Sequence, residues 1–262
     1  MTQDSRARFA EAARSEPVDV GLACLLVGAE VEPDLQVDDS LAVLDRLAAS
    51  CRVRAGAGPA ATARALRVAL GDRAGFAGRP DDYDDLRSSL LHEVLRRGRG
   101  LPILLTVVWL EVARRLDLPA YAVALPGHVV AGFGDPEDEH VLVDPFDGGR
   151  LLAPTDPSHP PPLLGHVDLL TRVLTNIRVL TTRQSPSLDA ARTRLWAVEL
   201  SLLLPRHAAS LRRERGELLV RLGDHLAGAA VLEEHAELVE PYEPDVAEQC
   251  RGEARQARAR LN

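Results

Sequence analysis

One apolar stretch, PILLTVVWLEVARRL from Pro102 to Leu116, limits how the rest of this chain can fold. Its first two turns carry apolar side chains on nearly every face, and the helix is expected to emerge toward solvent only at Glu111. A helix without a polar face belongs in the middle of a domain. Pro102 suits the first helical position, because its φ is fixed and an N–H there would lack a partner. We therefore predict a buried central helix over residues 102–116.

Three short segments after this helix are predicted to form a small antiparallel sheet within about residues 120–145. They read AYAVAL, HVVAGF and HVLVDP, with a turn at Pro126-Gly127 and the polar loop GDPEDE. A hairpin symmetric about Pro136 would place His128 directly opposite Asp144, with Cβ atoms about 4.5–5.5 Å apart. The carboxylate could then bind one imidazole nitrogen and leave the other free as a base. A register slip of one residue would separate the two side chains.

The remaining regular structure is predicted to be helical, because apolar residues recur at spacings of three and four. Four helices are expected within residues 3–72, with Gly71 ending the fourth, and four more follow residue 187. The connector APTDPSHPPPLLGH is rich in proline and is not expected to form regular structure. Ser185-Pro186-Ser187 predicts a boundary between a domain of residues 1–184 and a helical domain of residues 187–262.

Composition excludes several classes of function. The net charge is −8, whereas a nucleic-acid-binding face needs clustered basic residues. All 31 basic residues are arginine, so a lysine Schiff base is excluded. Clusters such as Arg96, Arg97 and Arg99 are expected to be solvated. No apolar run reaches the roughly 18 residues of a membrane helix, and the polar N-terminus does not resemble a secretory signal. We expect a cytoplasmic protein with no membrane partner.

The cysteines and histidines form no recognisable ligand pattern. Cys24, Cys51 and Cys250 are odd in number and far apart, which favours free thiols over disulfides. The histidines, among them His128, His140, His225 and His235, lack the spacing of a metal site. We therefore expect no cofactor and no metal.

The C-terminal sequence RERGELLVRLGDHLAGAAVLEEHAEL has the small-residue helix-turn-helix pattern of a tetratricopeptide-like unit. Such a pattern is typical of stacked helical hairpins, which often bind other proteins. The expected partner is therefore another protein, bound through the C-terminal helices.

Several motifs in a fixed order resemble one family. They are SSLLHEVLRRGRGLPILLTVVWLEVARRLDLP, ALPGHVV and VLVDPFDGGRLL, and the likeness extends from about residue 20 to the C-terminus. In these motifs the chain resembles the SirB-type transglutaminase-like proteins, a bacterial group. The resemblance implies an α+β, predominantly helical fold. A papain/transglutaminase-like core with a small antiparallel sheet would be followed by tetratricopeptide-like helical hairpins.

The resemblance also implies a site in which a Cys at the start of the central helix meets His and Asp from the strands. His128 and Asp144 match the last two, whereas the Cys would fall at about Pro102, which has no nucleophile. Thr106, one turn further on the same face, is the nearest hydroxyl, but its β-branched side chain is stiff and its pKa is high. Ser88 and Ser89 are expected to cap the start of the helix LLHEVLRRGRG, which follows them and precedes the central helix.

Two functions are compatible with these residues. The first is a transglutaminase-like protein that lacks the catalytic Cys and acts as a non-catalytic binding or scaffold module, with His128 and Asp144 as a vestigial pair. The alternative is a weak acyl-transfer or amide-hydrolysing enzyme in which the pair activates water or an amine. General-base catalysis contributes roughly 10²–10⁴-fold, so activity without a thiol is physically possible.

Overall fold

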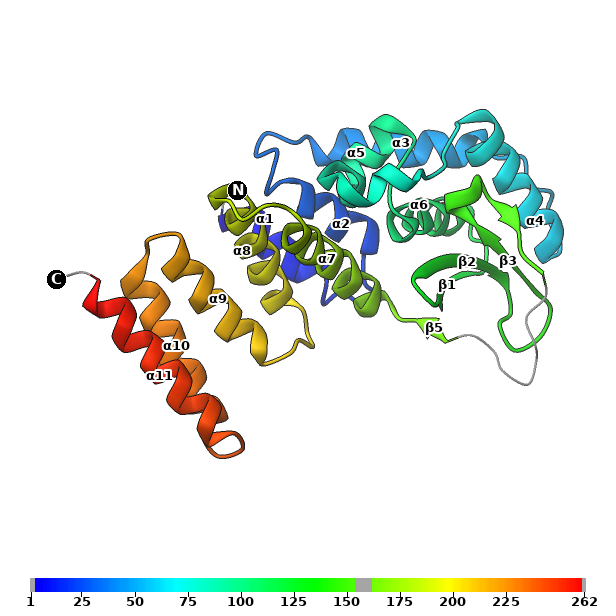
Figure 1. Ribbon diagram of the computed structural model, residues 1–262. Coiled ribbons are helices and arrows are strands. Elements are labelled where there is room, and N and C mark those ends of the chain that lie inside the picture. The colour runs from blue at the N-terminus through cyan, green and yellow to red at the C-terminus, as the bar shows by residue number, and fades with distance from the viewer. Residues whose placement is uncertain (1–2, 154–161, 261–262) are drawn as a thin grey trace. The chain divides into compact units, whose positions relative to one another are not determined.

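A computed structural model describes residues 3–153 and 162–260 (Figure 1). Helices and strands follow one another in the order α1 (Gln3–Ala12), α2 (Val20–Gly28), α3 (Val37–Ser50), α4 (Pro59–Leu66), η1 (Arg67–Arg73), η2 (Pro80–Asp84), η3 (Leu86–Ser89), α5 (Leu91–Arg97), α6 (Pro102–Arg115), β1 (Ala120–Leu125), β2 (His128–Gly134), β3 (His140–Asp144), η4 (Pro145–Asp147), β4 (Arg150–Leu151), β5 (Leu163–Leu164), α7 (His166–Arg183), α8 (Leu188–Leu203), α9 (Ser210–Arg221), α10 (His225–Val239) and α11 (Pro244–Ala259). The predicted α+β, predominantly helical fold class is confirmed.

The central helix α6 is buried, as its apolar sequence predicts. Every residue from Pro102 to Trp109 is buried, and the helix contacts β1 and β2 on one side and α2, α3 and α5 on others (Figure 1). Glu111 does not mark an emergence toward solvent, because it is buried as well. Its carboxylate accepts a hydrogen bond from the Gly21 N–H and pairs with Arg115 at 2.6 Å.

The sheet has five strands in the order β4-β3-β2-β1-β5, and each neighbouring pair is antiparallel. β1 and β2 are joined by Pro126 and Gly127, and Gly127 has a φ of 67°. Proline followed by a residue with positive φ is the pattern of a tight type II turn. His128 therefore begins β2 immediately after the turn, paired with Leu125.

The pairing of β2 with β3 differs from the predicted hairpin by two residues. Gly132 pairs with Leu142, and Ala131 pairs with Val143. Continued by one residue, this register places Asp144 opposite Val130 and not opposite His128. The prediction of direct opposition was therefore wrong. Because side chains alternate with a period of two, a shift of two residues leaves His128 and Asp144 on the same face.

The predicted connector of residues 153–166 contains a strand. Leu163 and Leu164 form β5, which pairs with Val123 and Ala122 of β1. Residues 154–161 of the connector lie outside the described residues. In the N-terminal part, four α-helices occur as predicted, but Gly71 does not end the fourth. It lies within the π-helix η1, where an added Cβ would stand 2.0 Å from the carbonyl oxygen of Gly148.

The chain divides into two compact units, Met1–Val173 and Leu174–Asn262, with the division inside α7. In the second unit, α8 and α9 share a core of Ala191, Val198, Leu211 and Leu218. α10 and α11 share two further clusters. α9 and α10 approach closely, since a Cβ on Gly228 would stand 2.6 Å from Val220 Cγ2. The tetratricopeptide-like character of these helices and the boundary near Ser187 remain predictions.

Of the helices in the described ranges, none has the length and apolar character that crossing a bilayer requires.

Candidate functional site

His128 and Asp144 meet at one edge of the ladder between β2 and β3. His128 Nε2 lies 2.9 Å from Asp144 Oδ1, and their side chains are 23% and 12% exposed. His128 is the first residue of β2, and Asp144 is the last residue of β3. The diagonal separation between residues offset by two is about 7–8 Å at the backbone, which these side chains can bridge.

Asp144 is held as an anion. Burial by itself raises the pKa of its carboxyl group, but the hydrogen bond and charge of His128 and the backbone N–H groups of Phe146 and Asp147 lower it by more, so the net pKa lies below the ordinary value. The Phe146 N–H donates to Oδ1 at 3.0 Å. An ionised carboxylate only accepts, so Nε2 of His128 carries the proton and donates it. In the neutral imidazole, Nδ1 is then the free base.

Aromatic rings support the imidazole from one side. The Phe146 ring meets the His128 ring edge to face, with centroids 5.9 Å apart and planes at 90°. Tyr83 packs against Phe146 at a centroid distance of 5.9 Å. Gly78 leaves the space for Phe146, because an added Cβ would stand 1.9 Å from that ring. The Gly78 N–H also donates to the Phe146 carbonyl at 2.8 Å.

Pro102 occupies the first position of α6, as the sequence predicts, and it is buried. The N–H of the preceding residue, Leu101, donates to the Ser88 carbonyl at 2.9 Å. Pro102 carries neither a thiol nor a hydroxyl, so no nucleophilic atom stands at this helix start.

Thr106 is fully buried, and its hydroxyl donates to the Val129 carbonyl at 3.1 Å. Val129 directly follows His128, so this bond ties the second turn of α6 to the start of β2. The hydroxyl thereby satisfies a backbone acceptor inside the domain.

Ser88 and Ser89 do not cap a helix. Both belong to η3, and the residue that precedes α5 is Leu90, which makes no side-chain cap. The Ser88 hydroxyl instead donates to Asp82 at 2.7 Å. Asp82 is completely buried and also binds Arg99 at 2.9 Å.

The arginines before α6 are not all solvated. The side chains of Arg97 and Arg99 are mostly buried, and both pair with Asp82. Sequence reasoning missed this cluster, because nothing in the spacing shows that the Asp81-Asp82 pair of one loop folds back on this segment. The one signal in the sequence is that a short acidic run containing Asp81 and Asp82 is followed by a short basic run containing Arg97 and Arg99.

His128 and Asp144 are not part of a metal site within residues 3–153 and 162–260. The single group of three potential ligands there is Glu32, His92 and Glu93, which lies on other elements. Among the described residues, the site therefore consists of an imidazole oriented by a carboxylate, with no third potential ligand beside them.

The sequence has counterparts among known proteins. Residues 38–159 match the profile described as the transglutaminase-like superfamily, a range that includes Pro102, His128 and Asp144. This part of the chain is therefore similar to a transglutaminase-like domain. No solved structure matches it.

The chain is similar to a UPF0162 protein of Xylella fastidiosa (strain Temecula1), with 35% identity over 182 residues that make up 61% of each chain. It is also 34% identical over 155 residues to UPF0162 protein PA3419 of Pseudomonas aeruginosa, covering 58% of this chain and 55% of that one. Mouse F-box only protein 21 is 28% identical over 95 residues, which are 34% of this chain and 15% of the mouse protein. The matched part spans about three fifths of the length of the bacterial relatives.

Proposed function

We propose that this protein is a non-catalytic, SirB-type transglutaminase-like module that acts by binding another protein. One observation carries the proposal. Pro102 stands at the start of α6, where the resemblance to transglutaminase-like enzymes implies a catalytic Cys. A helix N-terminus and an adjacent imidazolium lower the pKa of a thiol, but proline has no atom that could attack a substrate.

The other candidate nucleophiles also favour a non-catalytic protein. Cys24, Cys51 and Cys250 are all buried, and burial is the main cause that raises the pKa of each thiol. A buried thiol with a raised pKa is inert toward substrates. The hydroxyls of Ser88 and Thr106 are also buried and donate to Asp82 and to the Val129 carbonyl.

The His128–Asp144 pair has a structural role in this proposal. Asp144 accepts hydrogen bonds from the imidazole and from the Phe146 N–H, while its own carbonyl accepts from the Gly149 N–H at 2.8 Å. These contacts join the start of β2 to the turn η4. Retention of the pair without a nucleophile is then explained by stability.

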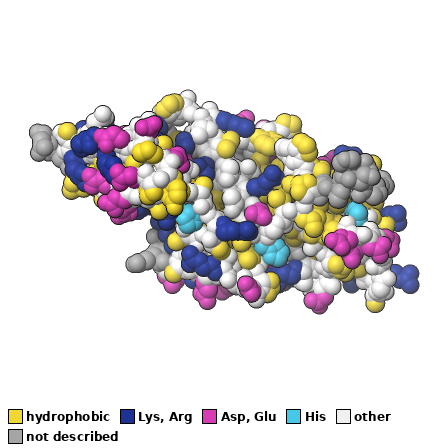
Figure 2. Space-filling view, turned by 90° about the horizontal axis from the view of Figure 1, so that it is seen from below, with side chains coloured by type: hydrophobic (Ala, Val, Ile, Leu, Met, Phe, Trp, Pro, Cys, Tyr) yellow, Lys and Arg dark blue, Asp and Glu magenta, His cyan; other side chains and the backbone are white. Residues whose placement is uncertain are grey.

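The C-terminal helices supply the surface for a partner. Tyr242 is 85% exposed, and large apolar side chains on α10, Leu226 and Leu238, are also exposed. Aromatic residues are enriched where proteins bind one another. At the end of Figure 2 that carries these helices, basic and acidic side chains alternate with no large area of one sign. A mixed surface of this kind suits a protein partner better than a polyanion.

A second candidate function rests on the geometry of the pair itself. The His128 side chain is partly exposed, and its Nδ1 is available as a base. In a weak acyl-transfer or amide-hydrolysing enzyme, this nitrogen would remove a proton from water or from an amine that attacks an amide carbonyl.

Turnover assays separate the two functions. The purified protein is incubated with a glutamine peptide and a labelled primary amine, and separately with chromogenic amides, beside its His128→Ala variant. The non-catalytic proposal expects no rate above buffer for either protein. Turnover that the substitution abolishes would establish the enzyme instead.

The binding role is tested by recovering a partner on the immobilised protein and measuring its affinity. A double variant, Leu226→Ser with Tyr242→Ser, should lose most of the binding. The matched control is Val31→Ser with Val68→Ser, which removes exposed apolar side chains from the first unit. Equal loss in both double variants would contradict docking on the C-terminal helices.

A further inference from the structure

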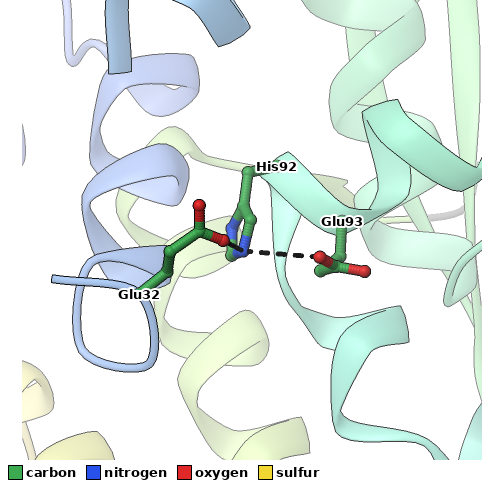
Figure 3. A group of neighbouring side chains, drawn as sticks. All are labelled: Glu32, His92 and Glu93. Carbon is green, nitrogen blue, oxygen red and sulfur yellow. Dashed lines mark ion pairs between the residues drawn. The ribbon is translucent and has the colours of Figure 1, made fainter. Parts of the chain in front are cut away.

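A second polar group lies in the first unit, apart from His128 and Asp144 (Figure 3). Glu32 belongs to the turn after α2, and its N–H donates to the Gly28 carbonyl at 3.0 Å. His92 and Glu93 belong to the first turn of α5. His92 Nε2 lies 3.6 Å from Glu32 Oε2 and 4.0 Å from Glu93 Oε1. We propose that these three side chains bind one divalent transition-metal ion, with Zn²⁺ as the ion that fits best.

His92 is the observation that distinguishes this group from an ordinary acidic surface. Its side chain is 2% exposed, yet both distances from Nε2 to the carboxylates are too long for hydrogen bonds. Nδ1 is buried without a partner among the described residues. Nδ1 points toward Gly28, so Nε2 is the nitrogen that faces both carboxylates and would bind the ion. Burial also lowers the pKa of His92, which keeps the imidazole neutral and able to bind a metal.

The backbone is shaped to admit the imidazole. An added Cβ on Gly28 would stand 2.1 Å from His92 Nδ1, so only glycine at the end of α2 leaves room for the ring. The same Gly28 carbonyl accepts the hydrogen bond that positions Glu32. Gly28 thus leaves room for the imidazole and fixes the backbone at Glu32.

The distances suit coordination after a small adjustment. Zinc binds imidazole nitrogen and carboxylate oxygen at about 2.0–2.2 Å, so two ligand atoms of a tetrahedral site lie roughly 3.3–3.6 Å apart. The separations of 3.6 and 4.0 Å need a closure of up to about 0.7 Å, and all three ligand atoms lie within 4.8 Å of one another. Glu32 and Glu93 are partly exposed and can rotate to provide it. Three protein ligands leave a fourth position for water, and the imidazole favours Zn²⁺ over Mg²⁺.

Arg96 pairs with both carboxylates when no ion is bound. Its guanidinium lies 2.7 Å and 2.8 Å from the two oxygens of Glu32 and 3.1 Å from Glu93. The hydrogen bond from Arg96 is the main cause that lowers the pKa of Glu32. The Arg96 side chain is 50% exposed and can swing into solvent. A bound ion would then replace one positive charge with two.

Titration calorimetry with Zn²⁺ on untagged, chelator-treated protein tests the proposal. We expect one ion per chain and a rise in the melting temperature with Zn²⁺, because an ion that binds only the folded state stabilises it. Glu93→Gln should weaken binding by at least about tenfold, since even indirect partners of metal ligands contribute 10–100-fold. Arg96→Ala should tighten binding by roughly two- to fivefold, because it removes a competing surface ion pair. Substitution with Co²⁺ should produce visible absorption bands.

The control is Arg258→Ala, which breaks the exposed pair with Glu233 in the second unit and should leave Zn²⁺ affinity unchanged. Glu93 is close to the surface, so its substitution by glutamine tests the site without the folding risk of replacing buried His92. Absence of saturable Zn²⁺ binding would overturn the proposal. So would an affinity that is the same in Glu93→Gln as in the unaltered protein.

Discussion

His128 Nε2 meets Asp144 Oδ1 at 2.9 Å although the two residues are not opposite each other in the β2–β3 ladder. The contact is diagonal, across an offset of two residues. An offset of one would have sent the two side chains to opposite faces of the sheet. The two side chains can bond because an even offset keeps them on one face of the sheet, even though neither residue is the directly opposed partner of the other.

The first prediction concerns Asp144. Its pKa in the folded protein is lowered, so its charge stabilises the fold above the unfolded pKa, and this contribution is lost as pH falls through the folded value. At pH 7, Asp144→Asn should lower the free energy of unfolding by about 1.5–3 kcal/mol, as expected for a hydrogen bond to a charged group. Urea unfolding should show a smaller difference near pH 2 than at pH 7.

The control for this experiment is Asp147→Asn, three residues away. Asp147 is exposed and pairs with exposed Arg150, so its loss should change stability by about 1 kcal/mol or less. An effect of Asp144→Asn that is equally large at both pH values would contradict the role of its charge.

The second prediction concerns Thr106. Thr106→Val keeps the shape but removes the hydroxyl that donates to the buried Val129 carbonyl, which costs about 1–3 kcal/mol. Thermal or urea unfolding measures this loss. Thr182→Val is the matched control, because the Thr182 hydroxyl is exposed and donates only within its own helix. Its stability should stay within about 0.5 kcal/mol.

The third prediction tests the position of the missing nucleophile. In Pro102→Cys, the thiol would stand at the N-terminus of α6, where a pKa lowered by one unit gives roughly tenfold more thiolate at neutral pH. We expect a small alkylating agent to label this thiol faster than the three native cysteines, because all four positions are buried but only this one stands at a helix N-terminus. Combining it with His128→Ala should slow the labelling. A rate that does not depend on His128 would place the ancestral nucleophile elsewhere.

The fourth prediction concerns packing in the second unit. Gly228→Ala forces a Cβ to 2.6 Å from Val220 Cγ2 and to 2.8 Å from the Gly216 carbonyl oxygen, so it should destabilise this unit by about 1–3 kcal/mol. Gly252→Ala in α11 meets nothing closer than the end of the Arg255 side chain, at 3.9 Å. It should stabilise α11 by about 0.5–1 kcal/mol. If both substitutions change the free energy of unfolding in the same direction, the close approach of α9 and α10 at Gly228 is contradicted.

The sequence alone determined the elements whose signal is local. The apolar run after Pro102 specifies a buried helix, the Pro-Gly turn specifies the start of β2 at His128, and apolar residues specify the strand β3 that ends at Asp144. The signal for each helix or strand lies within a few residues along the chain, and side-chain periodicity carries it directly.

Tertiary structure decided the features that join distant segments. The two-residue register offset, the burial of Asp82 beneath Arg99 and the meeting of Glu32 with His92 depend on how separate elements pack. Gly71 resembles a helix end in sequence, yet it is required by the approach of the Gly148 carbonyl. Local periodicity determines which face of a helix or strand is buried. Which residue of another element contacts that face depends on how the whole fold packs.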